Sequence, residues 1–323
     1  MLAVAFPSRG RAEIIELPRP ALRGPSDAIV LVTTAAIGPW DVDRFLGAGD
    51  PRVTPGGEFA GLVVETGEDV STIEIDDLVA NTVLHVGPDG KTDLFGSDAL
   101  PGGHAEYVRV PDADTTLTRI AASGEERAVL AGGTAGLGVG AAGMAVAVAP
   151  LGTYTVAGCD PIGITALIAL KNSVAGAGDR TFAIEGNAAR KTLAASLASK
   201  VFESVDSPSP HQTDVVIVGS VRDCPGIKAV TGSVKPGGYI IFAEPYGASR
   251  IHEPGSTMPE GVTISAADWP DVDNARKIVT DLQIRRIDLT PLVSHVMPLE
   301  DVQDAYEAAA GPGAGVQKVL LKP

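Results

Sequence analysis

Residues 158–163 form a glycine-rich turn whose surroundings suit a dinucleotide phosphate. The apolar run TYTVAG (153–158) predicts a strand that enters the turn, and a helix over about 161–174 is predicted to leave it. Such a turn directs the N–H groups of a helix N-terminus at a pyrophosphate, and its glycines allow close approach. We therefore predict a nicotinamide dinucleotide site formed by Gly158, Asp160, Pro161, Ile162 and Gly163.

Two further residues extend this prediction along the chain. Glu185 ends the predicted strand 181–185, 22 residues beyond Gly163. A carboxylate there would accept hydrogen bonds from the adenosine ribose and would repel a 2′-phosphate, which favours NAD over NADP. Gly219 ends the run DVVIVG (214–219), where a glycine would let the backbone approach the nicotinamide ribose.

Asp160 departs from the usual pattern, because it stands where the middle glycine is expected. A carboxylate about 4 Å from a phosphate charge costs on the order of 4 kcal/mol at an effective dielectric of about 20, unless it rotates toward solvent. The alternative is a Rossmann fold with weakened or lost cofactor affinity. A second run, residues 138–143, matches G-x-G-x-x-G by letter, but no strand precedes it. We expect a closely packed small-residue helix there.

The elements that position these residues change in character near residue 125. The first 120 residues read as strands and turns, with strands at 28–38, 60–67 and 105–111. Beyond that point apolar strands alternate with alanine-rich helices, as in βαβ units on a parallel sheet. We predict strands at 153–158, 181–185, 214–219, 238–244, 261–267 and 316–323, helices at 161–174, 188–198, 272–283 and 299–310, and a helix within 224–238 that closes on a Lys-Pro-Gly-Gly turn.

The composition excludes several classes of function. A formal charge of −15 and an aromatic content of 4% argue against binding to nucleic acid or to an anionic membrane surface. Cys159 and Cys224 are the only cysteines, which is too few for a four-cysteine zinc lobe or a disulfide scaffold. The longest mostly apolar stretch, residues 135–149, is shorter than the roughly 20 residues that a bilayer requires. We expect a cytoplasmic protein that acts on a small-molecule substrate.

Several segments together resemble the medium-chain dehydrogenase/reductase superfamily, which contains zinc alcohol dehydrogenases and quinone reductases. The resemblance covers essentially the whole chain, and its most specific segment is PGGEFAGLVVETGEDV (55–70). It implies an α/β fold, with a doubly wound parallel Rossmann sheet over residues 125–267 and a GroES-like β-barrel domain built from 1–124 and 268–323. The active site would lie in the cleft between the domains. The resemblance also implies a homodimer formed through sheet edges of the cofactor domain.

The same resemblance locates the three positions that hold catalytic zinc in the zinc enzymes of the superfamily. They fall on Gly38, Gly57 and Gly132, and none of these has a ligating side chain. The neighbouring acid, Glu58, cannot hold zinc alone. We therefore predict no zinc and place the chain in the zinc-less branch, with the quinone and enoyl reductases.

Without zinc, no Lewis acid would polarise an alcohol oxygen, so hydride addition to a conjugated C=C bond is the favoured reaction. We predict an NAD(P)H-dependent reductase of enoyl-thioesters, enones or quinones. Three candidates would serve the cleft: Asp43 in proton transfer, Trp40 as a pocket wall and Thr134 as a hydrogen-bond donor near the nicotinamide. We expect Asp41 and Glu58 to hold loops together. The alternatives are a zinc-free alcohol dehydrogenase of a specific pathway and a non-catalytic binding protein with a degenerate cofactor site.

Overall fold

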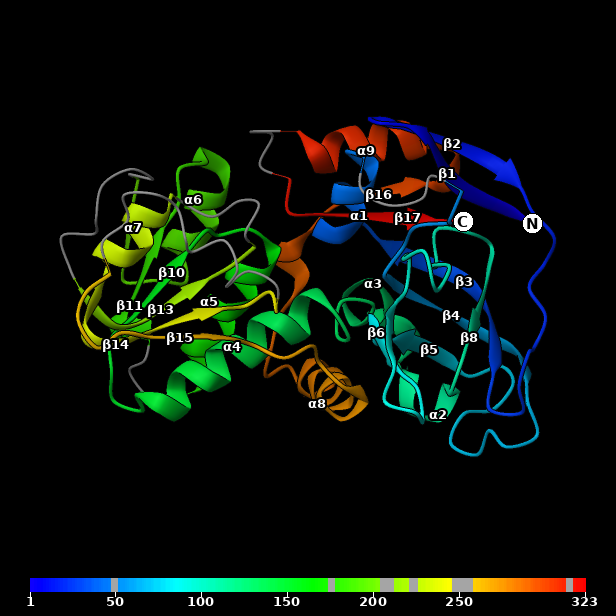
Figure 1. Cartoon of the computed structure of the whole chain (residues 1–323), viewed down its shortest axis with the longest axis horizontal. Coiled ribbons are helices and arrows are strands. Elements are labelled where there is room, and N and C mark those ends of the chain that lie inside the picture. Colours follow the sequence, from blue (N-terminus) through cyan, green and yellow to red (C-terminus); the bar gives the residue numbers. More distant parts are fainter. Residues whose placement is uncertain (48–51, 174–177, 204–211, 221–225, 246–257, 312–315) are drawn as a thin grey trace.

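The elements of the chain gather in two lobes, as a computed structural model shows (Figure 1). The structure describes residues 1–47, 52–173, 178–203, 212–220, 226–245, 258–311 and 316–323. Strands β10–β15 belong to one lobe, and strands β1–β9, β16 and β17 belong to the other. Helix α8 (Val272–Gln283) lies at the junction, where it packs against α3 (Glu125–Ala128) and α4 (Thr134–Val148).

The first lobe is built on a six-stranded parallel sheet with the strand order β12-β11-β10-β13-β14-β15. Strand β10 lies between β11 and β13, so the chain leaves it in opposite directions along the sheet. Such a reversal opens a crevice at the carboxyl ends of the strands, where ligands of this fold bind. The strands span β10 (Tyr154–Ala157), β11 (Thr181–Ile184), β12 (Lys200–Phe202), β13 (Thr213–Val218), β14 (Val234–Phe242) and β15 (Thr263–Ala266).

Helices cover this sheet, and glycine decides how closely two of them approach. A Cβ atom on Gly138 of α4 would lie 2.5 Å from the carbonyl oxygen of Ile162 in α5 (Pro161–Ser173). The run 138–143 therefore lies within a helix, as predicted, and not in a phosphate turn; Gly138 packs closely, whereas Gly140 and Gly143 are exposed. The other helices of this lobe are α6 (Ala188–Ala195) and α7 (Ile227–Gly232).

The second lobe contains a seven-stranded sheet whose central strands come from distant parts of the sequence. Strand β17 (Lys318–Lys322) lies between β16 (Val293–Pro298) and β3 (Ala28–Ala36), and β3 also pairs with β4 (Glu58–Thr66). Helix α9 (Val302–Ala310) covers β17 and contacts α1 (Pro39–Phe45). The remaining elements are β1 (Leu2–Ser8), β2 (Arg11–Glu16), β5 (Leu78–Asn81), β6 (Leu84–Val86), β7 (Thr92–Leu94), β8 (Tyr107–Val110), α2 (Ala113–Thr116) and β9 (Leu117–Arg119).

The predicted α/β fold with a parallel Rossmann sheet and a GroES-like lobe is confirmed, but one predicted turn is wrong. Helix α7 ends at Gly232, and Lys235-Pro-Gly-Gly238 belongs to the start of β14. The register between β13 and β14 shifts there, and Gly237 has a φ of 72°, which bends the strand where the sequence suggested a separate turn. Strand β12 had no counterpart in the prediction. No helix in the described ranges is long and apolar enough to cross a membrane.

Candidate active site between the two lobes

A cavity of about 260 Å³ lies between the lobes and gathers several of the predicted residues. Its walls are the N-terminal part of α1, the first residue of α4, the turn that enters α5, the end of α9 and the start of β17. Thr134, Asp160, Pro161 and Ile162 line it, as does Gly38, one of the three glycines that the resemblance compares with zinc ligands. Residues predicted from separate motifs therefore meet at one site.

The predicted phosphate turn has the expected backbone shape, but the carboxylate of Asp160 lies within it. Gly158 has a φ of 83°, which makes the sharp turn after β10. The Asp160 carboxylate does not rotate toward solvent: the residue is 2% exposed, and Oδ1 accepts hydrogen bonds from the N–H groups of Gly163 (3.0 Å) and Ser220 (3.1 Å). With Pro161 as the first helical residue, Asp160 caps the N-terminus of α5. This carboxylate uses a donor of the helix N-terminus, the place at which a phosphate would bind.

The two remaining glycines of the site pack against the same turn. A Cβ atom on Gly163 would lie 2.0 Å from the Gly158 carbonyl oxygen, so glycine is needed for α5 to pack on β10, as predicted. A Cβ atom on Gly219 would lie 2.4 Å from Oδ1 of Asp160. Gly219 therefore makes room for the aspartate in this structure, and its predicted approach to a ribose stays a prediction.

Glu185 follows β11, and groups of its own lobe already form hydrogen bonds and an ion pair with its carboxylate. Its carboxylate accepts hydrogen bonds from the N–H groups of Cys159 (2.8 Å) and Asn187 (2.7 Å), and it pairs with the Arg190 guanidinium at 3.2 Å. Glu185 is 3% exposed, whereas Arg190 lines the cavity. The positive charge of Arg190 thus offsets the repulsion that Glu185 was expected to exert on a 2′-phosphate. The sequence analysis missed Arg190, although its place in the first turn of the helix after Glu185 could have indicated it.

The three positions of the zinc ligands do not fit a metal ion. A Cβ atom would lie 2.4 Å from the Trp40 indole at Gly38 and 2.1 Å from its Nε1 at Gly57, so that indole fills the space between these two glycines. At Gly132 a Cβ atom would lie 2.1 Å from the backbone oxygen of Asn81. Within the described ranges, no group of three or more His, Cys, Asp or Glu side chains could hold a metal ion.

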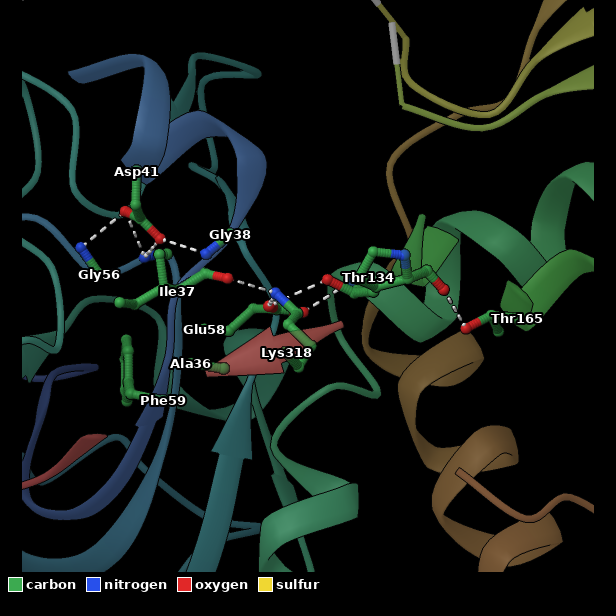
Figure 2. A network of polar contacts seen from close by, with 12 residues as sticks. Ala36, Ile37, Gly38, Asp41, Gly56, Glu58, Phe59, Thr134, Thr165 and Lys318 are labelled. Atoms are coloured by element: carbon green, nitrogen blue, oxygen red, sulfur yellow. Dashed lines mark hydrogen bonds and ion pairs between the residues drawn. The ribbon is translucent and has the colours of Figure 1, made fainter. Parts of the chain in front are cut away.

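Glu58 and Lys318 form a buried ion pair beside these glycines (Figure 2). Nζ of Lys318 lies 2.5 Å from Oε2 of Glu58 and donates to the carbonyl oxygen of Ile37 at 2.8 Å. Thr134 donates to Glu58 with its N–H group (2.5 Å) and its hydroxyl (3.0 Å). Burial raises the pKa of Glu58, and the charge of Lys318 opposes that shift. The Thr134 hydroxyl proton therefore points to Glu58, and Lys318, which the sequence analysis missed, brings a cation to the cavity wall.

Asp41 holds the loops around this pair, as the sequence analysis expected of it. Its carboxylate accepts hydrogen bonds from the N–H groups of Gly38 (2.9 Å) and Gly56 (2.9 Å), both visible in Figure 2, and from that of Gly57 (3.3 Å). Burial raises the pKa of Asp41 to about 6, although these hydrogen bonds oppose the shift. The loops that contain two of the former metal positions are thereby fixed to one side chain.

Two predicted residues lie outside the cavity lining. Asp43 is exposed on α1, so its proposed proton transfer stays a prediction that the geometry does not favour. Trp40 packs edge-on against Trp269, with 5.4 Å between ring centroids. Neither indole lines the cavity, so the predicted role of Trp40 as a pocket wall stays a prediction, and the buried Nε1 atom of each has no hydrogen-bond partner among the described residues.

His104, a buried histidine that contacts Tyr306 of α9, should make the free energy of unfolding depend on pH. His104 is buried, its Nδ1 faces the Tyr306 hydroxyl at 2.7 Å, and burial lowers its pKa to about 3. The unfolded chain takes up the proton below the usual value of 6.5, so His104 stabilises the fold above that pH and the stability is lost as the pH falls toward 3. We expect the stability difference between the native protein and His104→Gln to shrink by about 1.4 kcal/mol per pH unit from pH 6 to pH 4.

Urea denaturation across this pH range measures the effect, with the exposed His295→Gln as the matched control. The control should follow the native protein at every pH. A constant difference between the native protein and His104→Gln would show that His104 is protonated in the folded state.

Comparisons with known proteins give the family. Residues 24–120 match the alcohol dehydrogenase GroES-like domain. An alcohol dehydrogenase of Cupriavidus necator is 25% identical to this chain, over 100% of the chain and 99% of that protein. The chain belongs to the medium-chain dehydrogenase/reductase superfamily. The zinc-type alcohol dehydrogenase B of Aspergillus flavus, another similar protein, is 26% identical over 100% of the chain and 81% of that protein.

Solved structures of the medium-chain dehydrogenase/reductase fold agree over the whole chain. The alcohol dehydrogenase TADH from Thermus sp. ATN1 superposes with a TM-score of 0.81 at 23% identity, over 100% of this chain and 99% of that one. Galactitol-1-phosphate dehydrogenase from Escherichia coli gives a TM-score of 0.80 at 19% identity, with 100% of both chains covered. At these identities the likeness establishes the fold. The predicted oxidoreductase class is confirmed at the level of the superfamily.

Proposed function

We propose that the protein is a zinc-independent, NAD(P)H-dependent reductase of activated C=C bonds. The observation that carries the metal-independent part is the Trp40 indole, which occupies the space beside Gly38 and Gly57 where metal ligands would stand. The buried Lys318–Glu58 pair lies next to it. A side chain at Gly132 would in addition collide with backbone, so a metal site could not be formed there by small rearrangements.

The residues of the first lobe fit a dinucleotide, with one competing group. Asp160, Pro161 and Ile162 at the start of α5 line the part of the cavity that would receive the phosphates and the adenosine, as does Arg190, which pairs with Glu185. When bound, a reduced nicotinamide would supply a hydride. Asp160 competes with the phosphates for the N–H group of Gly163. Because Arg190 compensates Glu185, we propose that both NAD(H) and NADP(H) are accepted, with NAD(H) preferred.

The chemistry assigned to the cavity needs a cation near the substrate oxygen. Hydride addition to the β-carbon of an enone or enoyl-thioester places negative charge on the carbonyl oxygen, which a fixed positive group stabilises. Lys318 has three N–H donors, and Glu58 and Ile37 accept two of them. Lys318 lines the cavity, and we propose that its third N–H group donates to the substrate oxygen. The α-carbon then takes a proton from water.

A second candidate function is oxidation of a small alcohol without zinc. The similar proteins named above are alcohol dehydrogenases, and this favours alcohol chemistry for the chain. Lys318 could stabilise an alkoxide in the same position as an enolate oxygen. The two functions differ in product, since only the first changes a C=C bond.

The deciding experiment follows oxidation of NADH and NADPH with an enone, an enoyl-thioester and a quinone, beside reduction of NAD and NADP with a panel of alcohols. We expect turnover with at least one conjugated acceptor, and the rate should not change after dialysis against a strong zinc chelator. Loss of activity with the chelator and its return with zinc would refute the proposal. Turnover of alcohols alone would select the second candidate. We also propose a homodimer, because β15 is an edge strand of its sheet.

Asp160 gives this proposal a quantitative prediction. Replacing Asp160 with glycine removes a negative charge from the phosphate turn and frees the N–H groups of Gly163 and Ser220. We expect NADH to bind about tenfold more tightly or better, which corresponds to about 1.4 kcal/mol or more. The same change should lower stability by about 1 kcal/mol, because two buried N–H groups lose their acceptor.

Asp160→Asn is the matched control, since the amide keeps an acceptor oxygen and loses the charge. Titration calorimetry measures the affinity, and urea denaturation measures the stability. Tighter binding in both variants would assign the effect to charge. An unchanged affinity in both would contradict a phosphate at this turn.

A further inference from the structure

A second cavity, of about 500 Å³, opens on the GroES-like lobe and shares no lining residue with the cavity between the lobes. Its walls are the loop after β2 (residues 17–23), residues 52–54, residues 100–102 and strand β8. The size falls in the range of small-molecule sites, which is roughly 300–1,000 Å³. This cavity goes beyond the proposed function and does not depend on it.

The charge of this cavity is opposite to that of the whole protein. The chain has a formal charge of −15, yet four of its 16 arginines line the cavity: Arg19, Arg23, Arg52 and Arg109. Among the residues that the structure describes, no aspartate or glutamate lines it. Arg19 and Arg23 lie on one loop, and the fold brings Arg52 and Arg109 to them from distant parts of the sequence. Guanidinium groups that converge on one hollow are the usual means of binding a carboxylate or phosphate.

Two of these guanidinium groups are held in place before any ligand arrives. Tyr107 and Arg109 alternate along β8 with the buried Val108 and Val110, so both point away from the core. The guanidinium carbon of Arg19 lies 4.4 Å from the ring centroid of Tyr107, and stacking of this kind leaves the in-plane N–H groups available.

Arg109 is held by a buried acid. Its Nη1 atom lies 3.0 Å from Oδ2 of Asp27, whose side chain is 5% exposed. The same oxygen accepts hydrogen bonds from the backbone N–H groups of Arg23 (2.8 Å) and Gly24 (3.1 Å). Asp27 thus fixes both β8 and the loop after β2, and it neutralises one of the four positive charges. Arg19 and Arg23 form no ion pair with another described residue, so these two arginines give the cavity its positive charge.

The other part of the lining is aliphatic. Leu17, Leu22, Val53 and Leu100 lie between the arginines, together with prolines of the two loops. We propose that this cavity binds an organic anion: a carboxylate or phosphate head group held by Arg19, Arg23 and Arg109, with an aliphatic body on the leucines and valine. Burial of a short alkyl chain contributes about 0.8 kcal/mol per CH₂ group, so the body adds to the affinity of the head.

Titration calorimetry of the full chain tests the proposal with four probes: octanoate, octyl phosphate, octanol and inorganic phosphate. We expect octanoate or octyl phosphate to bind at least about tenfold more tightly than octanol, because only the charged heads pair with the arginines. Comparison of the two anions shows which head group is preferred. Inorganic phosphate should bind more weakly than octyl phosphate. Affinity should fall as salt rises.

The variant Arg19→Met/Arg23→Gln should lose about tenfold or more in affinity for the preferred anion. Arg11→Gln, which changes an exposed arginine at the far end of β2, is the matched control and should bind as the native protein does. Both side chains of the double variant are exposed, so folding should be unaffected. Binding without loss in the double variant, competition by NADH, or no binding of either alkyl anion at millimolar concentration would overturn the proposal. Each of these results leaves the reductase assay unchanged, so the two proposals fail separately.

Discussion

Lys318→Met should lower the free energy of unfolding by about 3–5 kcal/mol, the largest stability effect we expect for a single side chain here. The substitution keeps the aliphatic length but leaves the Glu58 carboxylate buried without its cation. Both side chains are at most 2% exposed, so the carboxylate would be left in a buried position without its charge partner. The carbonyl oxygen of Ile37 would lose its donor as well.

The double variant Lys318→Met/Glu58→Gln separates charge from packing. Removal of both charges leaves an amide that can still accept from Thr134, so we expect it to recover more than half of the stability lost in Lys318→Met. Urea denaturation of the native protein, of the single variants Lys318→Met and Glu58→Gln and of the double variant measures the coupling energy between the two side chains. Equal stabilities for Lys318→Met and the double variant would show that the ion pair contributes little.

The Lys318 variants also test whether this lysine takes part in the proposed reaction. If Lys318 faces the substrate oxygen, the double variant should fold and bind NADH but turn over a conjugated acceptor at least about a hundredfold more slowly, as when one oxyanion donor is removed. Lys318→Arg, which retains the charge, should keep part of the activity. A double variant with the native kcat would exclude Lys318 from the reaction.

Gly57→Ala and Gly132→Ala should both be strongly destabilising, by about 3 kcal/mol or more, but for different reasons. The new methyl group at residue 57 would lie 2.1 Å from Nε1 of Trp40, which is a side chain. At residue 132 it would lie 2.1 Å from the backbone oxygen of Asn81 in β5, which cannot move without disturbing the sheet.

Trp40→Ala, combined with each glycine substitution in turn, therefore distinguishes a clash with the Trp40 side chain from a clash with the backbone. Combined with Gly57→Ala it should remove most of the added cost, whereas combined with Gly132→Ala it should leave the costs additive. Thermal and chemical denaturation of the six proteins measure the two cycles. Additive costs at residue 57 would show that Trp40 does not occupy the former metal position in solution.

The sequence allowed the Rossmann lobe to be predicted closely because each of its elements carries its own local signal. Strand β10 and helix α5 of this lobe were visible as apolar runs, and at the junction of the lobes the amphipathic pattern of α8 gave its bounds as predicted. The turn at 158–163 was located for the same reason. The direction of the Asp160 side chain was not, because it depends on Ser220, which β13 brings close from 60 residues away.

The functional details that could not be predicted are long-range pairs. Lys318 reads as an ordinary strand residue, and only the fold brings it to Glu58, 260 residues earlier. The Trp40 indole likewise meets Gly57 and Trp269 through the packing of α1 between the lobes. Arg190 compensates Glu185 from the next helix. Charge compensation of this kind leaves no periodic signal in the sequence.

The central position of β17 has a consequence for biosynthesis. During translation, β3 emerges early, but its neighbour β17 is made some 280 residues later. At about 5–20 residues per second, the edge of β3 waits on the order of tens of seconds for its partner. The carboxylate of Glu58 likewise lacks its ion-pair partner until Lys318 has been synthesised. The Rossmann lobe, whose strands are contiguous, can form on the ribosome during that time, so the lobe that is translated first is completed last. An unpaired strand edge of this kind is what holding chaperones protect.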